Sequence, residues 1–160
     1  MSLDPDAFRS IMGRFASGVT VVTTRDADGR DHGLTVSAFC SLSLTPPLVI
    51  VSIDKEASMH PALDANGYFA VNFLADNQEA VARRFAAPET DRFEGIGFTR
   101  GSTGAPVLDD VLAFVECRKA TTLEGGDHTI FIGEVEHGDT PPGNTSPLLY
   151  YRGGYAQLIR

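Results

Sequence analysis

The sequence predicts a mainly β fold, an antiparallel β-barrel with two to three helices inserted into it. Stretches with strand character, about seven or eight in number, outnumber helical stretches and mostly follow one another directly along the chain. Gly 16 and Pro 9 are somewhat more than usual and supply the turns that such a fold needs. The 160 residues fit one domain over 1–160, with 42% hydrophobic residues to form its core.

The chain is expected to begin with an amphipathic helix. Asp4 precedes Pro5, and the apolar residues that follow recur at i, i+3, i+4 and i+7. An acidic cap, proline in the first turn and this spacing are typical of a capped helix with one apolar face. We expect Gly18 to end it.

The strands are predicted by β-branched and aromatic runs separated by Gly, Asn and Pro. The run 48–53 is apolar throughout, which predicts a strand buried on both faces. Two further helices are expected, one capped by Ser58 and ending at Leu63, the other over 77–87. The expected strands cover 19–24, 32–38, 48–53, 68–74, 111–123, 129–136, 148–152 and 155–159, with a hairpin turn at 125–127.

Composition and charge exclude several classes of function. A net charge of -8 argues against nucleic acid as a partner, because binding phosphates along a polymer needs a basic surface. No apolar run reaches the ~18 residues of a membrane span, and the N-terminus lacks the apolar segment of a signal peptide, so a cytoplasmic protein is expected. Cys40, Cys117 and the four histidines lack metal-ligand spacing. Reduced thiols are favoured, with a disulfide between the two cysteines left open.

Three patches could carry chemistry. Hydroxyls and small residues crowd 35–43, where backbone N–H and side-chain OH groups could bind a planar heterocycle. Lys55 and Ser58 come at an expected helix N-terminus, which suits a phosphate. His128 follows the hairpin turn at the start of an apolar strand, where it could contact a ligand or carry a proton near neutral pH.

Each patch also has a simpler interpretation. On spacing alone, 35–43 is better explained as a polar strand edge and turn. Ser58 is equally explained as a helix cap with Lys55 in solvent, and a lone histidine beside a turn is more often a surface residue. The three patches gain weight from occurring together, in this order and at these intervals.

Taken together, these stretches resemble the flavin reductase family, whose members serve two-component monooxygenase systems. The Gly-Asp-His turn with its following strand, and the terminal Tyr-Tyr-Arg-Gly-Gly-Tyr, are the most specific parts of the resemblance. The stretches that carry the resemblance are 8–24, 33–53, 68–86, 91–96, 104–110, 125–136 and 147–155.

The resemblance implies a homodimeric, FMN-binding split β-barrel that binds FMN or FAD noncovalently. It implies oxidation of NADH, or of NADPH, and release of reduced flavin to a partner monooxygenase. NADH is favoured because no extra Arg/Lys cluster for a 2′-phosphate is visible in the sequence near the expected site. Other readings stay open: a flavin carrier or sensor without turnover, a flavoenzyme with another small acceptor, or a structural barrel without ligand.

The resemblance also implies roles for particular residues. Asp54, Lys55 and Ser58 would hold the ribityl and phosphate part of the flavin, and Phe85 and Phe93 would border it. His128 would contact the nicotinamide nucleotide, as an anchor and not as an essential acid or base, together with Tyr151, Arg152 and Gly153. The residues that would line the isoalloxazine site are Thr35, Ser37, Ala38, Phe39, Cys40 and Ser41.

Overall fold

The computed structural model describes residues 2–88, 91–143 and 146–160. Strands dominate these residues, as the sequence predicts, and the hydrogen-bonded pairs are all antiparallel. The helices are α1 (Pro5–Met12), α2 (His60–Ala65) and α3 (Glu79–Ala86). The strands are β1 (Ser17–Gly18), β2 (Thr20–Arg25), β3 (Asp31–Val36), β4 (Phe39–Ser43), β5 (Leu48–Asp54), β6 (Tyr68–Phe73), β7 (Phe98–Arg100), β8 (Pro106–Leu108), β9 (Ala113–Gly125), β10 (His128–Asp139), β11 (Leu148–Tyr151) and β12 (Gly154–Gln157).

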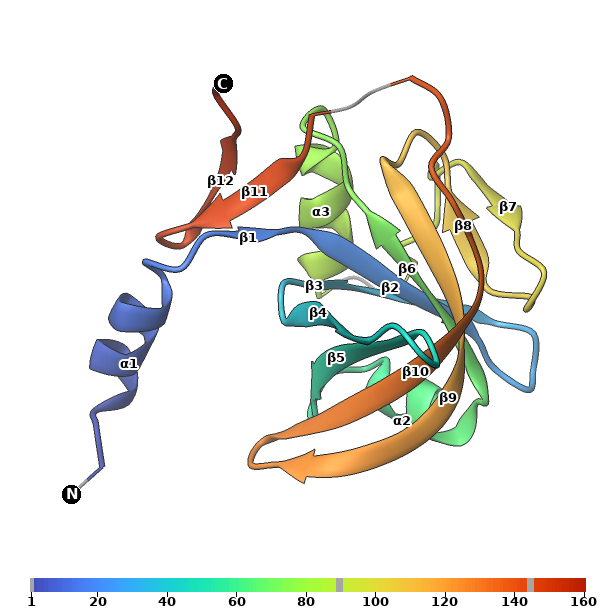
Figure 1. Cartoon of the computed structure of the whole chain (residues 1–160), viewed down its shortest axis with the longest axis horizontal. Helices are drawn as coiled ribbons and strands as arrows, with labels where there is room; N and C mark the ends of the chain where they lie inside the picture. Colours follow the sequence, from blue (N-terminus) through green and yellow to red (C-terminus); the bar gives the residue numbers. More distant parts are fainter. Residues whose placement is uncertain (1, 89–90, 144–145) are drawn as a thin grey trace.

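The main sheet has seven strands in the order β3-β2-β6-β9-β10-β5-β4. Its two edge strands, β3 and β4, are consecutive in the chain and are joined only by Ser37 and Ala38. The sheet must therefore curl until its two edges approach each other, and Figure 1 shows this curvature. Within the described residues no strand pairing joins β3 to β4, so the sheet stays open along this line.

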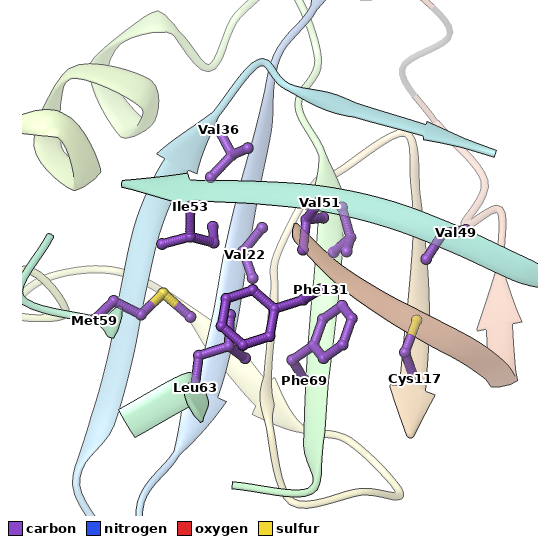
Figure 2. Close-up of a cluster of buried hydrophobic side chains, with 11 residues drawn as sticks. Val22, Val36, Val49, Val51, Ile53, Met59, Leu63, Phe69, Cys117 and Phe131 are labelled. Atoms are coloured by element: carbon purple, nitrogen blue, oxygen red, sulfur yellow. The ribbon is translucent and has the colours of Figure 1, made fainter. Parts of the chain in front are cut away.

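Two clusters of buried side chains pack on opposite faces of the central strands. Val22, Phe69 and Phe131 belong to the cluster enclosed by the curved sheet, where Figure 2 shows side chains from several strands pointing toward one another. Val21 and Phe85 belong to the second cluster, which lies between the sheet and α3 and includes the buried face of that helix. Because successive residues of a strand point to opposite faces, neighbours such as Val21 and Val22 supply both clusters.

Strand β5 was expected to be buried on both faces, and the structure shows that only one face is buried. Val49, Val51 and Ile53 are buried, whereas Leu48, Ile50 and Ser52, which alternate with them, are only half-buried. One face of β5 packs into the core and the other lies toward the outside of the curved sheet. An apolar run alone cannot distinguish this arrangement from a strand that is covered twice.

Two expected helix boundaries were wrong. Asp4 does cap α1, accepting from the backbone N–H of Ala7 at 3.3 Å, but the helix ends at Gly13, and Gly18 lies in β1 opposite Leu149. Helix α2 begins at His60 with Pro61 in its first turn, and no side chain caps it, so Ser58 precedes the helix without capping it.

Helix α1 lies apart from the main sheet, next to the small sheet β1-β11-β12 (Figure 1). None of its residues is buried, although one face carries Phe8, Ile11 and Met12, each more than half exposed. Phe15, just after the helix, is 77% exposed. Among the described helices, none has the length and apolar character that would let it cross a bilayer.

Candidate functional site

The free edge of β3 forms one wall of an elongated groove. Among the described residues β3 pairs only with β2, so its other edge presents backbone N–H and C=O groups that no strand in this part of the chain uses. Residues 34–38 line a cavity of about 420 Å³, called here the serine cavity. Residues 30–33, at the other end of the strand, line a cavity of about 460 Å³, called here the arginine cavity.

The segment 52–59 forms the opposite wall of both cavities. Ser52, Asp54, Glu56 and Ala57 line the serine cavity, and the next two residues, Ser58 and Met59, line the arginine cavity. Both walls therefore pass from one cavity to the other at neighbouring residues. The two cavities are successive parts of one groove.

The serine cavity brings together residues from the three sequence patches. Ser37 and Ala38 form the link that follows β3, Asp54 ends β5, and His128 begins β10 directly opposite Asp54 in the strand register. Thr35 also lines this cavity, but its hydroxyl donates to the carbonyl of Ala82 at 2.6 Å, so it positions β3 against α3.

The ring of His128 is held by its sequence neighbour. Its Nδ1 lies 2.7 Å from a carboxylate oxygen of Asp127, and the hydrogen bond to His128 lowers the pKa of the Asp127 carboxyl from its ordinary value. The carboxylate is the acceptor, so Nδ1 carries the proton and donates it. Within the described part of the chain, Nε2 of His128 has no side-chain or backbone partner.

Lys55 lies outside both cavities. Its ammonium group pairs with Glu124, which lowers the pKa of the Glu124 carboxyl, and its backbone N–H donates to the carbonyl of Asp127 at 3.0 Å. Lys55 thus ties the end of β5 to the hairpin turn that carries His128. In this geometry it positions the histidine and does not line the expected phosphate site.

The arginine cavity contains Ser58 and Phe93, as expected from the resemblance, and three residues that sequence reasoning missed: Arg30, His32 and Arg92. His32 Nε2 lies 2.8 Å from a carboxylate oxygen of Asp26, and the Nη1 of Arg92 donates to the carbonyl of Gly33 at 2.9 Å.

The loop that carries Arg92 and Phe93 is fixed by Arg84 of α3. The Arg84 guanidinium donates to three carbonyls of this loop, those of Asp91, Arg92 and Glu94, at 3.0, 3.2 and 2.9 Å. The wall of the arginine cavity is therefore held from behind by hydrogen bonds to its backbone.

Phe85 lies behind the groove and not at its surface. Its side chain is fully buried and meets the ring of Phe93 edge to face, with ring centroids 5.0 Å apart. A Cβ atom at Gly33 would lie 2.6 Å from this ring, so the close approach of β3 to Phe85 requires glycine there. Phe85 supports the wall that Phe93 and Gly33 present.

Other residues expected at the site lie elsewhere in the chain. Phe39 packs on Phe73, with centroids 5.3 Å apart, and lines a separate, mostly apolar cavity of about 340 Å³ together with Ser37. Cys40 is exposed and unpaired on β4, next to the exposed Ser41.

The turn Tyr151, Arg152 and Gly153 is also separate from His128 within one chain. It joins β11 to β12 beside α1, where the backbone N–H of Arg152 donates to the carbonyl of Gly13 at 2.8 Å. Figure 1 places this turn well away from the β9–β10 turn that carries His128. The structure therefore does not bring the expected nicotinamide residues together in a single subunit.

Comparison with known proteins assigns the chain to a family. The sequence pattern of the flavin reductase like domain matches residues 12–158, nearly the whole chain. The chain belongs to the flavin reductase family. Residues of the family domain thus include both walls of the groove and the hairpin of His128.

Three flavin reductase relatives illustrate the similarity. A flavin reductase (NADH) of Kitasatospora aureofaciens is 48% identical over 157 residues, covering 97% of this chain and 82% of the relative. The reductase component of a 4-nitrophenol 4-monooxygenase/4-nitrocatechol 2-monooxygenase of Rhodococcus opacus is 40% identical, covering 98% and 83%. A solved structure of an NADH:FAD oxidoreductase of Streptomyces globisporus C-1027, in complex with NAD and FAD fragments, is 37% identical with a TM-score of 0.91, covering 99% and 97%.

The groove of this flavin reductase has the donor set that a flavin ring needs. An isoalloxazine edge alternates hydrogen-bond donors and acceptors, and the free edge of β3 offers both kinds of backbone group in alternation. The hydroxyls of Ser37 and Ser52 line the same cavity and have no hydrogen-bond partner among the described residues. Over those residues, no cluster of three His, Cys, Asp or Glu side chains could hold a metal ion.

Proposed function

We propose that the protein is an NAD(P)H:flavin oxidoreductase that supplies reduced FMN or FAD to a partner monooxygenase. The observation that carries this proposal is the groove itself, in which a free strand edge faces a histidine across the serine cavity. Family membership supports the flavin reductase activity, and the Rhodococcus opacus relative, named as a reductase component, supports the monooxygenase partner.

The protein contributes binding and orientation. The backbone edge of β3, with Ser37 and Ser52, would hold the polar rim of the flavin ring against the wall of the serine cavity. When bound, the flavin supplies the redox chemistry by accepting a hydride from the nicotinamide. His128, fixed through Nδ1 by Asp127, offers Nε2 to the nicotinamide nucleotide and keeps it close to the flavin site.

The proposal includes a homodimeric split barrel. The curved but open main sheet is consistent with a split barrel, and the exposed apolar face of α1 is of a kind that a second copy would cover. Because Arg152 and its turn lie beside α1, a second copy packed there would stand close to them. We assign this turn to the nicotinamide site of the opposite subunit, which accounts for its distance from His128 in one chain.

Activity is tested with purified protein, each of FMN and FAD, and each of NADH and NADPH, by following the absorbance of the reduced nicotinamide. Oxidation that depends on added flavin is the expected result. Flavin binding without oxidation in any of the four mixtures would instead favour a carrier or sensor.

The role of His128 is tested by His128→Ala with His137→Ala as the matched control, since His137 lies on the same strand but is exposed and outside the groove. Loss of one hydrogen bond to the nucleotide should raise the KM for NADH about tenfold, with a smaller change in kcat. The control should match the wild type. An unchanged KM for NADH in His128→Ala would refute the anchoring role.

A further inference from the structure

The start of β10 carries His128 to the groove, although the hairpin to which it belongs is largely exposed near its turn. We propose that Thr129 and His60 form a positioning pair that sets the place of His128, and through it the binding of the nicotinamide nucleotide. Neither residue of the pair touches the nucleotide, and both act through His128. The inference rests on the proposed function and names two residues that its nicotinamide site needs.

The β9–β10 hairpin has little support near its turn. Strand β6 pairs with β9 only as far as Arg118, and the residues of β9 from 120 to 125 are all exposed. Within the described residues, this end of β9 therefore has β10 as its only neighbouring strand. On its other side β10 pairs with β5, up to His128 opposite Asp54. A strand end beside an exposed turn frays readily, so the position of His128 depends on what holds β10 there.

Asp127 fixes the ring of His128 but not the strand that carries it. Its carboxylate accepts from Nδ1 of the ring at 2.7 Å, yet its own side chain is 91% exposed. The turn is held from one side by the backbone N–H of Lys55, which donates to the carbonyl of Asp127 at 3.0 Å. A ring oriented by this turn is only as well placed as the first residues of β10.

Thr129 supplies an anchor on the buried face of β10. Successive side chains of a strand point to opposite faces, so His128 faces the groove while Thr129 points inward, paired in the register with the fully buried Ile53. Thr129 is 6% exposed, and its hydroxyl oxygen lies 2.8 Å from Nε2 of His60. Because a buried hydroxyl needs a hydrogen-bond partner, this contact joins β10 to α2 one residue after His128.

His60 is itself well fixed. It is the first residue of α2 and precedes Pro61, whose ring restricts the backbone there. The imidazole of His60 meets the ring of Phe131 edge to face, with centroids 5.7 Å apart, and Phe131 is fully buried in the cluster of Figure 2. His60 therefore contacts two successive inward-facing residues of β10, Thr129 and Phe131. It holds the strand from the side opposite the groove.

Thr129→Val tests the pair, because valine keeps the branched shape of threonine and lacks its hydroxyl. The variant should raise the KM for NADH about fivefold and change kcat and the KM for flavin less than about twofold, since His128 is displaced and the groove is not. Thr129→Ser keeps the hydroxyl and should match the wild type. Thr121→Val makes the same substitution at an exposed position of β9 outside both cavities, and this matched control should leave the KM for NADH unchanged.

A double-mutant cycle separates positioning from a general loss of structure. In a His128→Ala background, Thr129→Val should have no further effect on the KM for NADH, because the pair acts only through His128. His60→Gln, which can return an amide N–H to Thr129, should raise this KM less than His60→Leu does. An unchanged KM in Thr129→Val, or an equal rise in the His128→Ala background, would overturn the inference.

Hydrogen exchange of the backbone amides gives a measurement that needs no substrate. In Thr129→Val the amides of residues 128–131 should exchange at least about fivefold faster than in the wild type, while those of β2 keep their protection. Unchanged exchange at 128–131 would contradict the anchoring of β10 by this pair.

Failure of this inference is distinguishable from failure of the proposed function. If the wild type oxidises NADH with added flavin and Thr129→Val has the same KM, the protein remains a flavin reductase and only the role of the pair falls. If the wild type oxidises neither NADH nor NADPH with any flavin, the proposed function falls together with the inference.

Discussion

Two neighbouring interior strands of the main sheet, β2 and β6, and helix α1 use apolar residues in opposite ways. In β2 and β6 the neighbouring residues Val21 and Val22, and Phe69 and Ala70, are fully buried, so both faces of the sheet are covered within one chain. In α1 the apolar residues Phe8 and Ile11 share one face and are each more than half exposed. The centre of the fold is complete in itself, whereas the apolar face of α1 needs a partner, which we propose is a second copy.

The largest effect should follow from damage to the self-contained centre. Phe69→Ala removes a ring that is fully buried in the cluster of Figure 2, and it should lower the free energy of unfolding by about 3–5 kcal/mol. Urea unfolding at low protein concentration measures this change in the free energy of unfolding. Phe8→Ala in α1 is the matched control and should cost less than about 1 kcal/mol under the same conditions. Similar decreases in the free energy of unfolding for both variants would contradict the contrast between the buried centre and α1.

A smaller change in stability, but a large change in assembly, is expected in α1. Ile11→Asp places a charge on the apolar face and should weaken the proposed dimer roughly a hundredfold, because an unpaired charge would be desolvated there. Analytical ultracentrifugation should then find the mass of one chain instead of two.

The control for the assembly experiment is Ser10→Asp, which adds the same charge about 100° around the helix axis from Ile11 and about 200° from Phe8, on the side of α1 away from its apolar face. It should leave the dimer intact. A wild-type protein that sediments as a single chain, or an Ile11→Asp variant that still dimerises fully, would refute the assignment of this face to a second copy.

Chemical labelling of the two cysteines compares the buried centre of the fold with its exposed surface. Burial raises the pKa of the Cys117 thiol to about 12, helped by the nearby carboxylates of Glu116 and Glu136, so the reactive thiolate is absent at neutral pH. Cys40 is exposed on β4. A thiol reagent should label one cysteine in the native protein and two after unfolding, and Cys40→Ser should abolish native labelling. Native labelling of two cysteines would indicate that the centre opens readily.

The smallest effect concerns the turn before β3. The hydrogen bond from His32 is the main cause that lowers the pKa of the Asp26 carboxyl below its ordinary value of 3.8. The ionised form is thus favoured by folding, so its stabilising effect is present above that ordinary value and is lost as the pH falls through the lower folded-state value. Asp26→Asn should shift the urea midpoint slightly at neutral pH, and the shift should disappear in acid. A shift that persists in acid would mean that the carboxylate charge is not its cause.

Much of the fold was predictable because its signals are local. The β-branched run after Gly18 and the Gly-Gly-Asp turn lead to β2 and to the β9–β10 hairpin, which the structure confirms. Two predicted helix boundaries were wrong because other residues determine them. Gly18 lies in a strand because it pairs with the distant Leu149, and Pro61, in the first turn of α2, favours a helix start after Ser58.

The site was predictable only in part, for a related reason. Ser37, Asp54 and His128 each lie at a strand end that the sequence marks, and they do line one cavity. No strand end in the sequence indicates a role for Arg30 or Arg92. The cavity that they share forms only when β3 packs against the loop after α3. Lys55 was expected to face a phosphate, but its ammonium group pairs with the carboxylate of Glu124, which is 69 residues away in the sequence. The resemblance to a family names residue types at positions, and only tertiary packing decides which of them face the groove.

The two-residue link between β3 and β4 has a consequence for how this family can vary. Along the open line of the sheet, the backbone groups of β3 that a closing strand would use are the same groups that we propose for the flavin ring. Closing the sheet and binding the ligand are therefore mutually exclusive uses of one strand edge. A bound flavin would act as the missing neighbour of β3, so changes that improve strand pairing across this line should be selected against, even where they would make the fold more stable.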